Sequence, residues 1–294
     1  MGFVTNLSDK DARKALEELN ENPETRDEKI QELRRLCLDS PKIPEVCRER
    51  LDDVFLVRFL RVSKFDLDRA LNRLENYFQL QIDWPENFGD FRFETIKPLL
   101  EAGMSQLMKK RGEDGMSTIC FRAKEWDYEK YPISMVYRAA TFVFEYCLLD
   151  ESFQINGCRA VGDMSGLSFA YMRHMEIRIV KMWARALDKC LPVRTKSMII
   201  FNQPSFIVMI FKIFQMVMSK KMRERMQMFG KNEGSVRQIL LENVGEESLP
   251  EDFGGTVTQE EAKKFLEDIE EKAPQIEKSF SYLQKLYEKS GTEL

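Results

Sequence analysis

"LPVRTKSMIIFNQPSFIVMIFKIFQMVMSKKMRERMQMFG", residues 191–230, joins an apolar segment to a basic one. The run from Phe206 to Met218 includes only two polar side chains, Lys212 and Gln215. A membrane-spanning helix, a buried core helix and a movable lid over an apolar cavity could each have this composition. A transmembrane helix needs roughly 18 or more apolar residues in succession, and no run in the chain is that long. The membrane-spanning interpretation is therefore excluded.

The periodicity of this run predicts one helix that starts at Pro204, where the missing N–H of proline costs no hydrogen bond. A helix that is apolar on all faces is normally buried, which favours a core helix. Three Met and three Phe in the run favour a lid instead, because flexible Met side chains adapt to varied ligands. Both interpretations stay open. The residues that share one face at i, i+3 and i+4 spacing are Phe206, Met209, Ile210, Ile213, Phe214 and Val217.

A basic island accompanies the apolar run. Eight Lys or Arg and one acid lie in residues 191–231, whereas the whole chain has a formal net charge of −4. That overall charge argues against a general nucleic-acid binder, so no nucleic-acid partner is expected. Arg194 and Lys196 share a face of an extended segment, and Lys221 and Arg225 share a face of a helical turn. If the two segments lie side by side, these cations suit a phosphorylated headgroup; otherwise they are ordinary solvated charges.

The chain from residue 117 onward alternates short apolar runs with helical stretches, which predicts an α/β fold with parallel strand pairs. The earlier part reads as a cluster of helices with Ser8 and Asp66 as N-caps. The segment from residue 259 to 294 reads as one or two surface helices. Strands are expected at 117–123, 158–165 and 196–202, with a further candidate at 225–230. Helices are expected at 8–22, 24–39, 52–65, 66–84, 133–151, 169–191 and 234–244.

The residues that enzymes commonly use are sparse. The single histidine, His174, lies in a helical stretch without a catalytic partner, and no Gly-rich nucleotide loop is present. The six cysteines form no CxxC pair, so neither a zinc site nor a disulfide framework is expected. The N-terminus lacks the pattern of a secretion signal. We therefore expect a non-enzymatic protein without metal or cofactor, cytoplasmic and only transiently at membranes.

Several ordered motifs resemble the CRAL-TRIO lipid-transfer family, over roughly residues 25–257. "DDVFLVRFLRVSKFDLDRAL" (52–71) is similar to the family's N-terminal helical signature, and "NGCRAVGDMSGLS" (156–168) to its strand and turn. The segment 191–230 and "LPEDFGGT" (249–256) occupy the places of its third strand, gating helix and closing segment. The pattern is closest to the tocopherol- and retinaldehyde-binding members.

The resemblance implies an N-terminal helical domain (1–90), a lipid-binding bowl with a mixed, mostly parallel sheet (91–257) and a C-terminal helical tail (258–294). It also implies a mobile gate helix at about 204–219. In tocopherol-type members four basic positions beside the gate bind phosphoinositides such as phosphatidylinositol bisphosphate. The matching residues here are Arg194, Lys196, Lys221 and Arg225.

Two positions depart from the tocopherol-type pattern. Gly162 replaces a bulky aromatic residue, and Phe144 replaces a small serine, so vitamin E is not carried over as the ligand. Tyr137, Thr141 and Glu145 are the polar groups that could orient a hydroxyl or an aldehyde. Any of the expected wall residues could equally be ordinary core. They are Tyr137, Ala140, Thr141, Phe144, Gly162, Trp183, Leu187, Leu191, Phe206, Met209, Ile210 and Phe214.

The leading expectation is therefore a carrier of a small hydrophobic ligand, such as a retinoid, a tocopherol or another isoprenoid. It would exchange that ligand at phosphoinositide-containing membranes through peripheral contact. A phospholipid or phosphatidylinositol exchange protein is the nearer alternative. A membrane-recruited adaptor with a vestigial cavity is the alternative from another class, and an enzyme acting on a lipid is the least favoured.

Overall fold

The strands of the structure, a computed structural model that describes residues 2–230 and 236–290, form one five-stranded sheet. They lie in the order β1-β2-β3-β4-β5, with β1 antiparallel to β2 and the other neighbours parallel. The predicted α/β class with a mostly parallel sheet is confirmed. The bounds are Ser105–Leu107 (β1), Ser117–Arg122 (β2), Cys158–Asp163 (β3), Thr195–Gln203 (β4) and Met226–Gly230 (β5).

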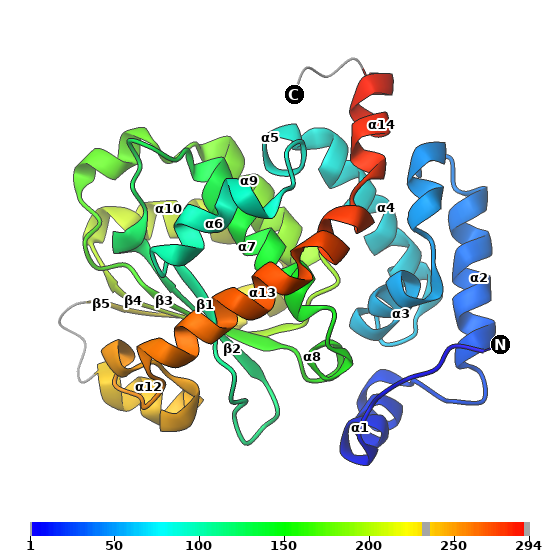
Figure 1. Ribbon diagram of the computed structural model, residues 1–294, viewed down its shortest axis with the longest axis horizontal. Coiled ribbons are helices and arrows are strands. Elements are labelled where there is room, and N and C mark those ends of the chain that lie inside the picture. Colours follow the sequence, from blue (N-terminus) through cyan, green and yellow to red (C-terminus); the bar gives the residue numbers. More distant parts are fainter. Residues whose placement is uncertain (1, 231–235, 291–294) are drawn as a thin grey trace.

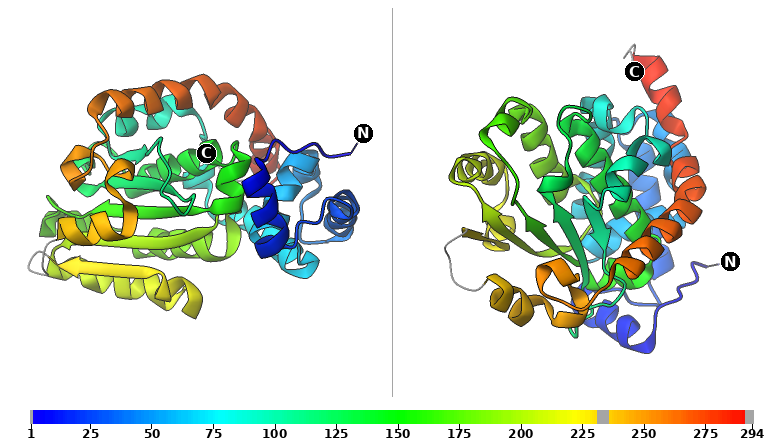
Figure 2. Two further views of the ribbon diagram at one scale, coloured as in Figure 1. Left: turned by 90° about the horizontal axis from the view of Figure 1, so that it is seen from below. Right: turned by 60° about the vertical axis from the view of Figure 1, so that its left-hand side comes forward.

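The two faces of the sheet bury different side chains, because successive residues of a strand point to opposite sides. Cys120, Val161 and Ile199 pack in a core with helix α12 (Val236–Val244). Their neighbours Ile119, Ala160 and Ile200 face the main core of the molecule. Figure 2 shows α12 and the larger set of helices on opposite sides of the sheet.

Helices α6 to α11 surround the main face of the sheet. The predicted helix at 133–151 ends at Cys147, and a new helix starts after Asp150, whose side chain accepts a hydrogen bond from Ser152 N. The predicted helix at 169–191 is also interrupted, because the backbone of Glu176 is extended. The bounds are Phe93–Glu101 (α6), Ala123–Glu125 (η2), Ile133–Cys147 (α7), Glu151–Asn156 (α8), Phe169–Arg173 (η3), Ile177–Arg185 (α9), Ala186–Cys190 (η4, a π turn), Ser205–Met216 (α10), Lys220–Glu224 (α11), Glu246–Ser248 (η5) and Glu251–Phe253 (η6).

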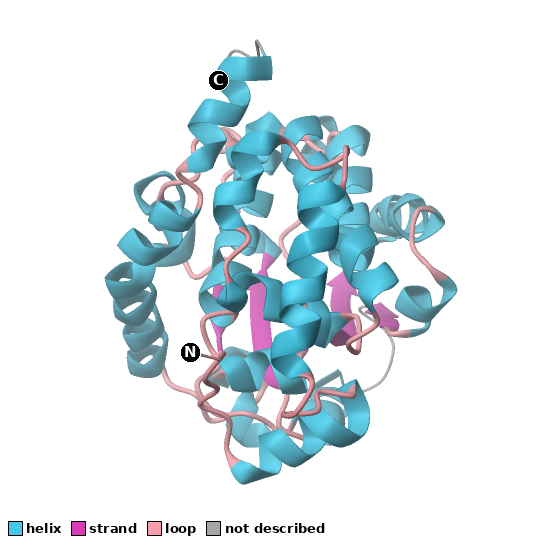
Figure 3. Cartoon of the chain, turned by 90° about the vertical axis from the view of Figure 1, so that its right-hand side faces the viewer, coloured by secondary structure: helices cyan, strands magenta, loops and turns pink. Residues whose placement is uncertain are grey.

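The N-terminal helices stand beside the sheet, in front of it when the molecule is viewed from the right-hand side of Figure 1 (Figure 3). Ser8 and Asp66 cap their helices as predicted, accepting hydrogen bonds from Asp11 N and Arg69 N. Within the described residues no helix is long and apolar enough to cross a bilayer. The bounds are Asp9–Leu19 (α1), Arg26–Asp39 (α2), Glu45–Arg50 (η1), Asp53–Val62 (α3), Leu67–Asp83 (α4) and Pro85–Phe88 (α5).

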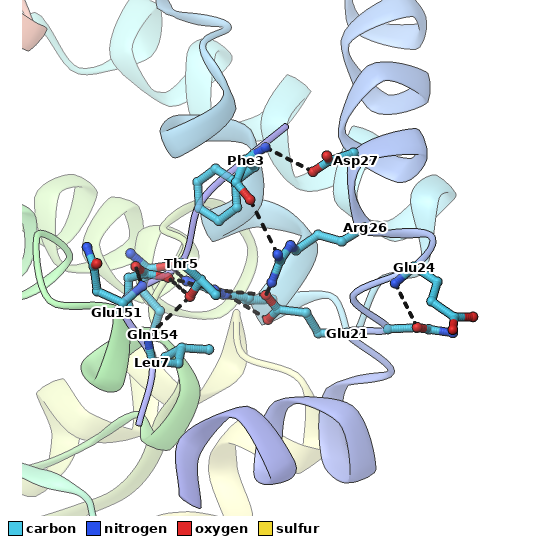
Figure 4. Close-up of polar contacts among 12 residues, drawn as sticks. Phe3, Thr5, Leu7, Glu21, Glu24, Arg26, Asp27, Glu151 and Gln154 are labelled. Carbon is cyan, nitrogen blue, oxygen red and sulfur yellow. Dashed lines mark hydrogen bonds and ion pairs between the residues drawn. The ribbon is translucent and has the colours of Figure 1, made fainter. Parts of the chain in front are cut away.

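Arg61 of α3 joins the N-terminal helices to the sheet-bearing part of the chain. Its buried guanidinium donates to Glu21 and to Glu151 at 2.8 Å, and to Gln154 at 2.7 Å. The hydroxyl of Thr5 donates to the same Glu151 carboxylate at 2.6 Å (Figure 4). Because Glu151 and Gln154 lie in α8, this network fixes the N-terminal arm and α3 to the end of α8.

The C-terminal helices pack against both parts of the molecule. Helix α13 (Gln259–Ser279) crosses α6, α7 and β1, and α14 (Tyr282–Ser290) reaches η1 (Figure 1). The hydroxyls of Tyr282 and Tyr287 both donate to Gln81 of α4, at 2.7 Å. The sequence predicted surface helices here, but α14 buries both of these rings. The boundaries near residues 90 and 257 remain a prediction.

Candidate functional site

An apolar cavity of about 210 Å³ lies between the main face of the sheet and helices α7, α9 and α10. Strands β2, β3 and β4 form its floor, and α7 and α9 form its walls. Ile207, Ile210 and Phe214 of α10 close it from the remaining side. Nearly all of its surface is hydrocarbon, aromatic ring or thioether. Such a cavity is suited to a small hydrophobic molecule.

Helix α10 also has an apolar outer face. Met209 and Met216 are 62% and 78% exposed, and Val208 is partly exposed beside them. Phe169 of η3 is 72% exposed and packs edge-to-face on Phe206 at 5.9 Å between ring centroids. Neither the core-helix nor the lid interpretation alone describes this helix: one face closes a cavity, and the other forms an exposed apolar patch.

Both ends of α10 are tied to the rest of the molecule. At its start, Asn202 has a left-handed backbone (φ 56°) and its side chain donates to Asp163 at 3.0 Å. Past its end, the backbone N–H and the hydroxyl of Ser219 donate to the Asp188 carboxylate at 2.7 and 2.8 Å. Asparagine tolerates the left-handed region better than most residues. These contacts hold the two ends of α10 in place.

The four predicted cations form one cluster, which we call the basic cluster: Arg194, Lys196, Lys221 and Arg225. Burial lowers the pKa of Lys221, and the nearby Arg225 guanidinium lowers it further. Burial and the Arg194 guanidinium lower the pKa of Lys196 in the same way. Repulsion between like charges adds to the effect of burial. The Arg225 guanidinium donates a hydrogen bond to the Thr195 carbonyl, so the strand and the helical turn do lie side by side, as the sequence predicted.

Charged residues of the N-terminal helices lie around the basic cluster. Glu18 of α1 lies 3.6 Å from the Arg194 guanidinium and 3.8 Å from the Lys196 ammonium. Lys64 and Arg69 contribute positive potential at Lys221. The cluster is therefore an electropositive site. Glu18 of the N-terminal helices partly neutralises Arg194 and Lys196, and Asp188 partly neutralises Arg225.

Comparisons with known proteins agree with this architecture. A family model described as "CRAL/TRIO domain" matches residues 101–255. The chain belongs to the CRAL/TRIO family. A second model, "Pinta-like, UBA domain", matches residues 22–94. The resemblance seen in the sequence is thus confirmed, and the family is one of lipid-binding and lipid-transfer proteins.

Curated relatives match along most of the CRAL/TRIO chain. "Alpha-tocopherol transfer protein-like" from Mus musculus is 33% identical over 87% of this chain and 72% of that protein. "Clavesin-1" from Rattus norvegicus is 30% identical over 85% of this chain and 70% of its own length. A solved structure, "Crystal structure of Sfh5", is 13% identical with a TM-score of 0.49, covering 86% of this chain and 89% of that one.

Seven of the expected wall residues line the cavity of this CRAL/TRIO domain. Helix α7 presents three of them, α9 and the π turn after it present two, and α10 presents two. Each of these helices turns one face to the cavity, and residues three or four apart share that face. They are Tyr137, Ala140, Phe144, Trp183, Leu187, Ile210 and Phe214.

The other five expected wall residues lie off the wall. Thr141 is buried on the far side of α7, where its hydroxyl donates to the Tyr137 carbonyl. Leu191 is buried in the core next to the π turn. Met209 points outward, and Phe206 packs on Phe169. For Phe206 and Met209 the cause is that α10 is apolar all round, so its sequence does not reveal which face is inside.

Gly162, the fifth, makes room for a ring from the neighbouring strand. It pairs with Phe121 across β2 and β3, and a Cβ atom added to Gly162 would lie 2.0 Å from that ring. Phe121 itself lines the cavity. The bulk that tocopherol-type members are expected to carry on β3 is thus supplied here by β2.

Several strand residues that line the cavity were not among the wall residues expected from the sequence. Ile119 and Phe121 on β2, and Met198 and Ile200 on β4, all face it. Their i, i+2 spacing places each pair on one face. That signal was present in the sequence, but choosing between the two faces required knowing which of them α12 covers.

The polar candidates have different environments. Glu145 is buried away from the cavity, where it accepts hydrogen bonds from Arg58 at 3.2 Å and from the Tyr77 hydroxyl at 3.4 Å. Arg122 touches the cavity but donates to Asp252 at 2.6 and 2.8 Å and to the Gly103 carbonyl at 3.1 Å. Tyr137 is the one of the three predicted polar residues that lines the cavity.

Proposed function

We propose that the protein is a carrier of one small hydrophobic molecule, which it loads and releases at phosphoinositide-bearing membranes through movement of α10. The observation that carries this proposal is the double-sided α10. Its inner face closes an apolar cavity, and its outer face is an exposed apolar patch. The basic cluster follows directly through Lys221 of α11.

The cavity favours a retinoid, a tocopherol or another isoprenoid as cargo over a phospholipid. A phosphodiester inside the cavity would need a cationic or multiple hydrogen-bonding partner. Arg122 is the cation in the cavity wall, and Asp252 already neutralises it. Similarity to the relative "Alpha-tocopherol transfer protein-like" also favours an isoprenoid. The runner-up, phospholipid exchange, has no comparable support.

Membrane docking combines two contributions. Burying exposed Met side chains in lipid gains about 25 cal/mol for each Å² of apolar surface. Each Lys or Arg close to an anionic surface adds roughly 1 kcal/mol. Because the apolar patch and the basic cluster are adjacent along the chain, one orientation satisfies both. Docking in this orientation would draw α10 into the membrane surface and open the cavity toward it.

The carrier is further proposed to work in the cytoplasm. All six cysteines are unpaired and buried. Unpaired thiols of this kind suit a reducing compartment, where disulfides are rare.

Native mass spectrometry tests the carrier function directly. Purified protein incubated with a panel of retinoids, tocopherols, carotenoids and phospholipids is expected to retain one hydrophobic molecule per chain. Solvent extraction then identifies the molecule retained. Retention of phospholipids alone would favour the exchange function, and a protein that retains nothing from the panel would contradict the carrier proposal.

A further inference from the structure

Tyr137 occupies a rigid place in the cavity wall. Its ring stacks on Trp183 at 5.0 Å between centroids with an interplanar angle of 25°. Trp84 packs against it edge-to-face at 6.0 Å. Two large rings therefore fix the direction of the phenol, and the side chain lines the cavity from the middle of α7.

The hydroxyl of Tyr137 has no hydrogen-bond partner among residues 2–230 and 236–290. Two buried aromatic donors elsewhere are satisfied: the Trp126 indole donates to the Tyr131 carbonyl at 2.8 Å, and the Tyr282 hydroxyl donates to Gln81. The indole N–H of Trp84 is buried without a partner among the described residues. Buried Tyr hydroxyls usually find a partner. Burial raises the pKa of the Tyr137 phenol, so the group stays protonated and can donate.

The other polar groups of the cavity wall have hydrogen-bond partners, are closed off from the cavity or can reach water at a surface groove. Arg122 is saturated by Asp252 and by the carbonyl of Gly103. The oxygen of Thr195 is fully buried and not open to the cavity. Ser105 also lines a surface groove next to residues 250–259, where water can satisfy its hydroxyl. Tyr137, which is half-buried and lines the cavity, is left as the donor that a molecule inside the cavity would satisfy.

We propose that Tyr137 is the polar anchor of the cargo, donating a hydrogen bond to a carbonyl, ester or ether oxygen at one position of an otherwise apolar molecule. This inference rests on the proposed carrier function and narrows its cargo class. Pure hydrocarbons leave the hydroxyl unpaired, and molecules with several polar groups bring donors and acceptors that the apolar wall cannot satisfy.

A matched pair of probes tests the anchor. Benzophenone and diphenylmethane have the same two rings and differ by one carbonyl oxygen. Their dissociation constants are measured by displacement of a fluorescent hydrophobe from the full chain and from Tyr137→Phe. The control is Tyr146→Phe, the same change on the same helix, at a ring that packs on Phe265 of α13 and does not line the cavity. Thermal unfolding of all three proteins checks that they are folded.

The preference for benzophenone over diphenylmethane is expected to fall by about 3- to 10-fold in Tyr137→Phe, as the loss of one hydrogen bond predicts. It should stay unchanged in Tyr146→Phe. Because each preference is a ratio within one protein, a general change in the cavity cancels. An equal preference in wild type and Tyr137→Phe would overturn the anchor and leave the carrier proposal standing. Failure of the fluorescent hydrophobe and both probes to bind wild type would overturn both.

Discussion

The four side chains of the basic cluster differ in how many hydrogen bonds and ion pairs fix their positions. The Arg194 guanidinium donates to the Ile155 carbonyl, and the Arg225 guanidinium donates to the Thr195 carbonyl. Lys221 has no hydrogen-bond or ion-pair partner among the described residues, and Lys196 has only the long contact with Glu18. The arginines therefore shape the site, whereas the lysines are available to bind a phosphate.

Removing both lysines should weaken membrane binding without disturbing the fold. Lys196→Ala with Lys221→Ala is expected to lower affinity for phosphoinositide vesicles by about 30-fold, at roughly 1 kcal/mol for each lysine. Vesicle flotation at low salt measures it, since screening weakens the effect at high salt. Lys220→Ala is the matched control, because Lys220 is highly exposed and pairs with Glu224. Equal binding by the double variant and the control would contradict the role of the cluster.

Glu18 occupies the position that a phosphate would take beside Arg194 and Lys196. Glu18→Gln is therefore expected to tighten binding to the same vesicles. The gain should be at most about 5-fold, because half-exposed ion pairs are worth about 1 kcal/mol or less. Glu17→Gln removes a neighbouring exposed carboxylate of α1 and serves as the control. Weaker binding by Glu18→Gln would show that α1 supports the site and does not compete for it.

At the level of elements, the position of α10 was predicted from the sequence, but the orientation of its faces was not. The span of about 204–219 that the resemblance implied contains the observed Ser205–Met216, and Pro204 precedes the first residue as predicted. Which face is inside could not be read from a pattern that is apolar all round. Strand β1 was missed altogether, because three residues are too few to show alternation.

The outer face of α10 should contribute to membrane binding independently of charge. Met209→Asp with Met216→Asp is expected to reduce binding to vesicles by at least about 10-fold, since two apolar contacts are lost and two charges must stay in water. Flotation at high salt isolates this apolar contribution. Val54→Asp, on the N-terminal helix α3 and also exposed, is the control. The cavity should still bind hydrophobic probes in all variants; loss of probe binding would mean that the substitutions disturb the inner face.

At the level of the whole molecule, the N-terminal helices, the sheet and the C-terminal helices share buried polar links. Arg61 connects α3 to α8, and Gln81 receives both tyrosines of α14. The sequence predicted each helical segment but not these links, since they join residues 40 to 206 positions apart. Long-range pairing of this kind leaves no local pattern.

The carboxylate of Glu151 makes this link sensitive to acid. Burial alone would raise its pKa, but hydrogen bonds from Thr5, from the backbone of Asn6 and from Arg61 outweigh burial and lower the pKa below 4.5. A group with a lowered pKa in the folded state stabilises above its unfolded pKa, and that stability disappears as pH falls through the folded value. The free energy of unfolding should therefore drop below about pH 4.5.

Urea unfolding at pH 7 and pH 4 measures this drop. Glu151→Gln is expected to be less stable than wild type at pH 7 and to lose less stability between the two pH values. A variant whose pH dependence matches that of wild type would assign the acid sensitivity to other carboxylates, such as Asp252, whose pKa is also lowered because its ion pair with Arg122 outweighs burial.

The ties at the two ends of α10 bear on how long a carrier keeps its cargo. The side chain of Asp188 accepts a hydrogen bond from Ser219, and its backbone carbonyl accepts one from Arg73 of α4. The proposed movement of α10 would therefore strain a chain of contacts that reaches the N-terminal helices. In the proposed mechanism, escape of the cargo away from a membrane would require breaking those contacts without compensation, so the residence time would be set by a kinetic barrier and need not follow affinity. Even a cargo with low affinity would then have a long residence time away from membranes.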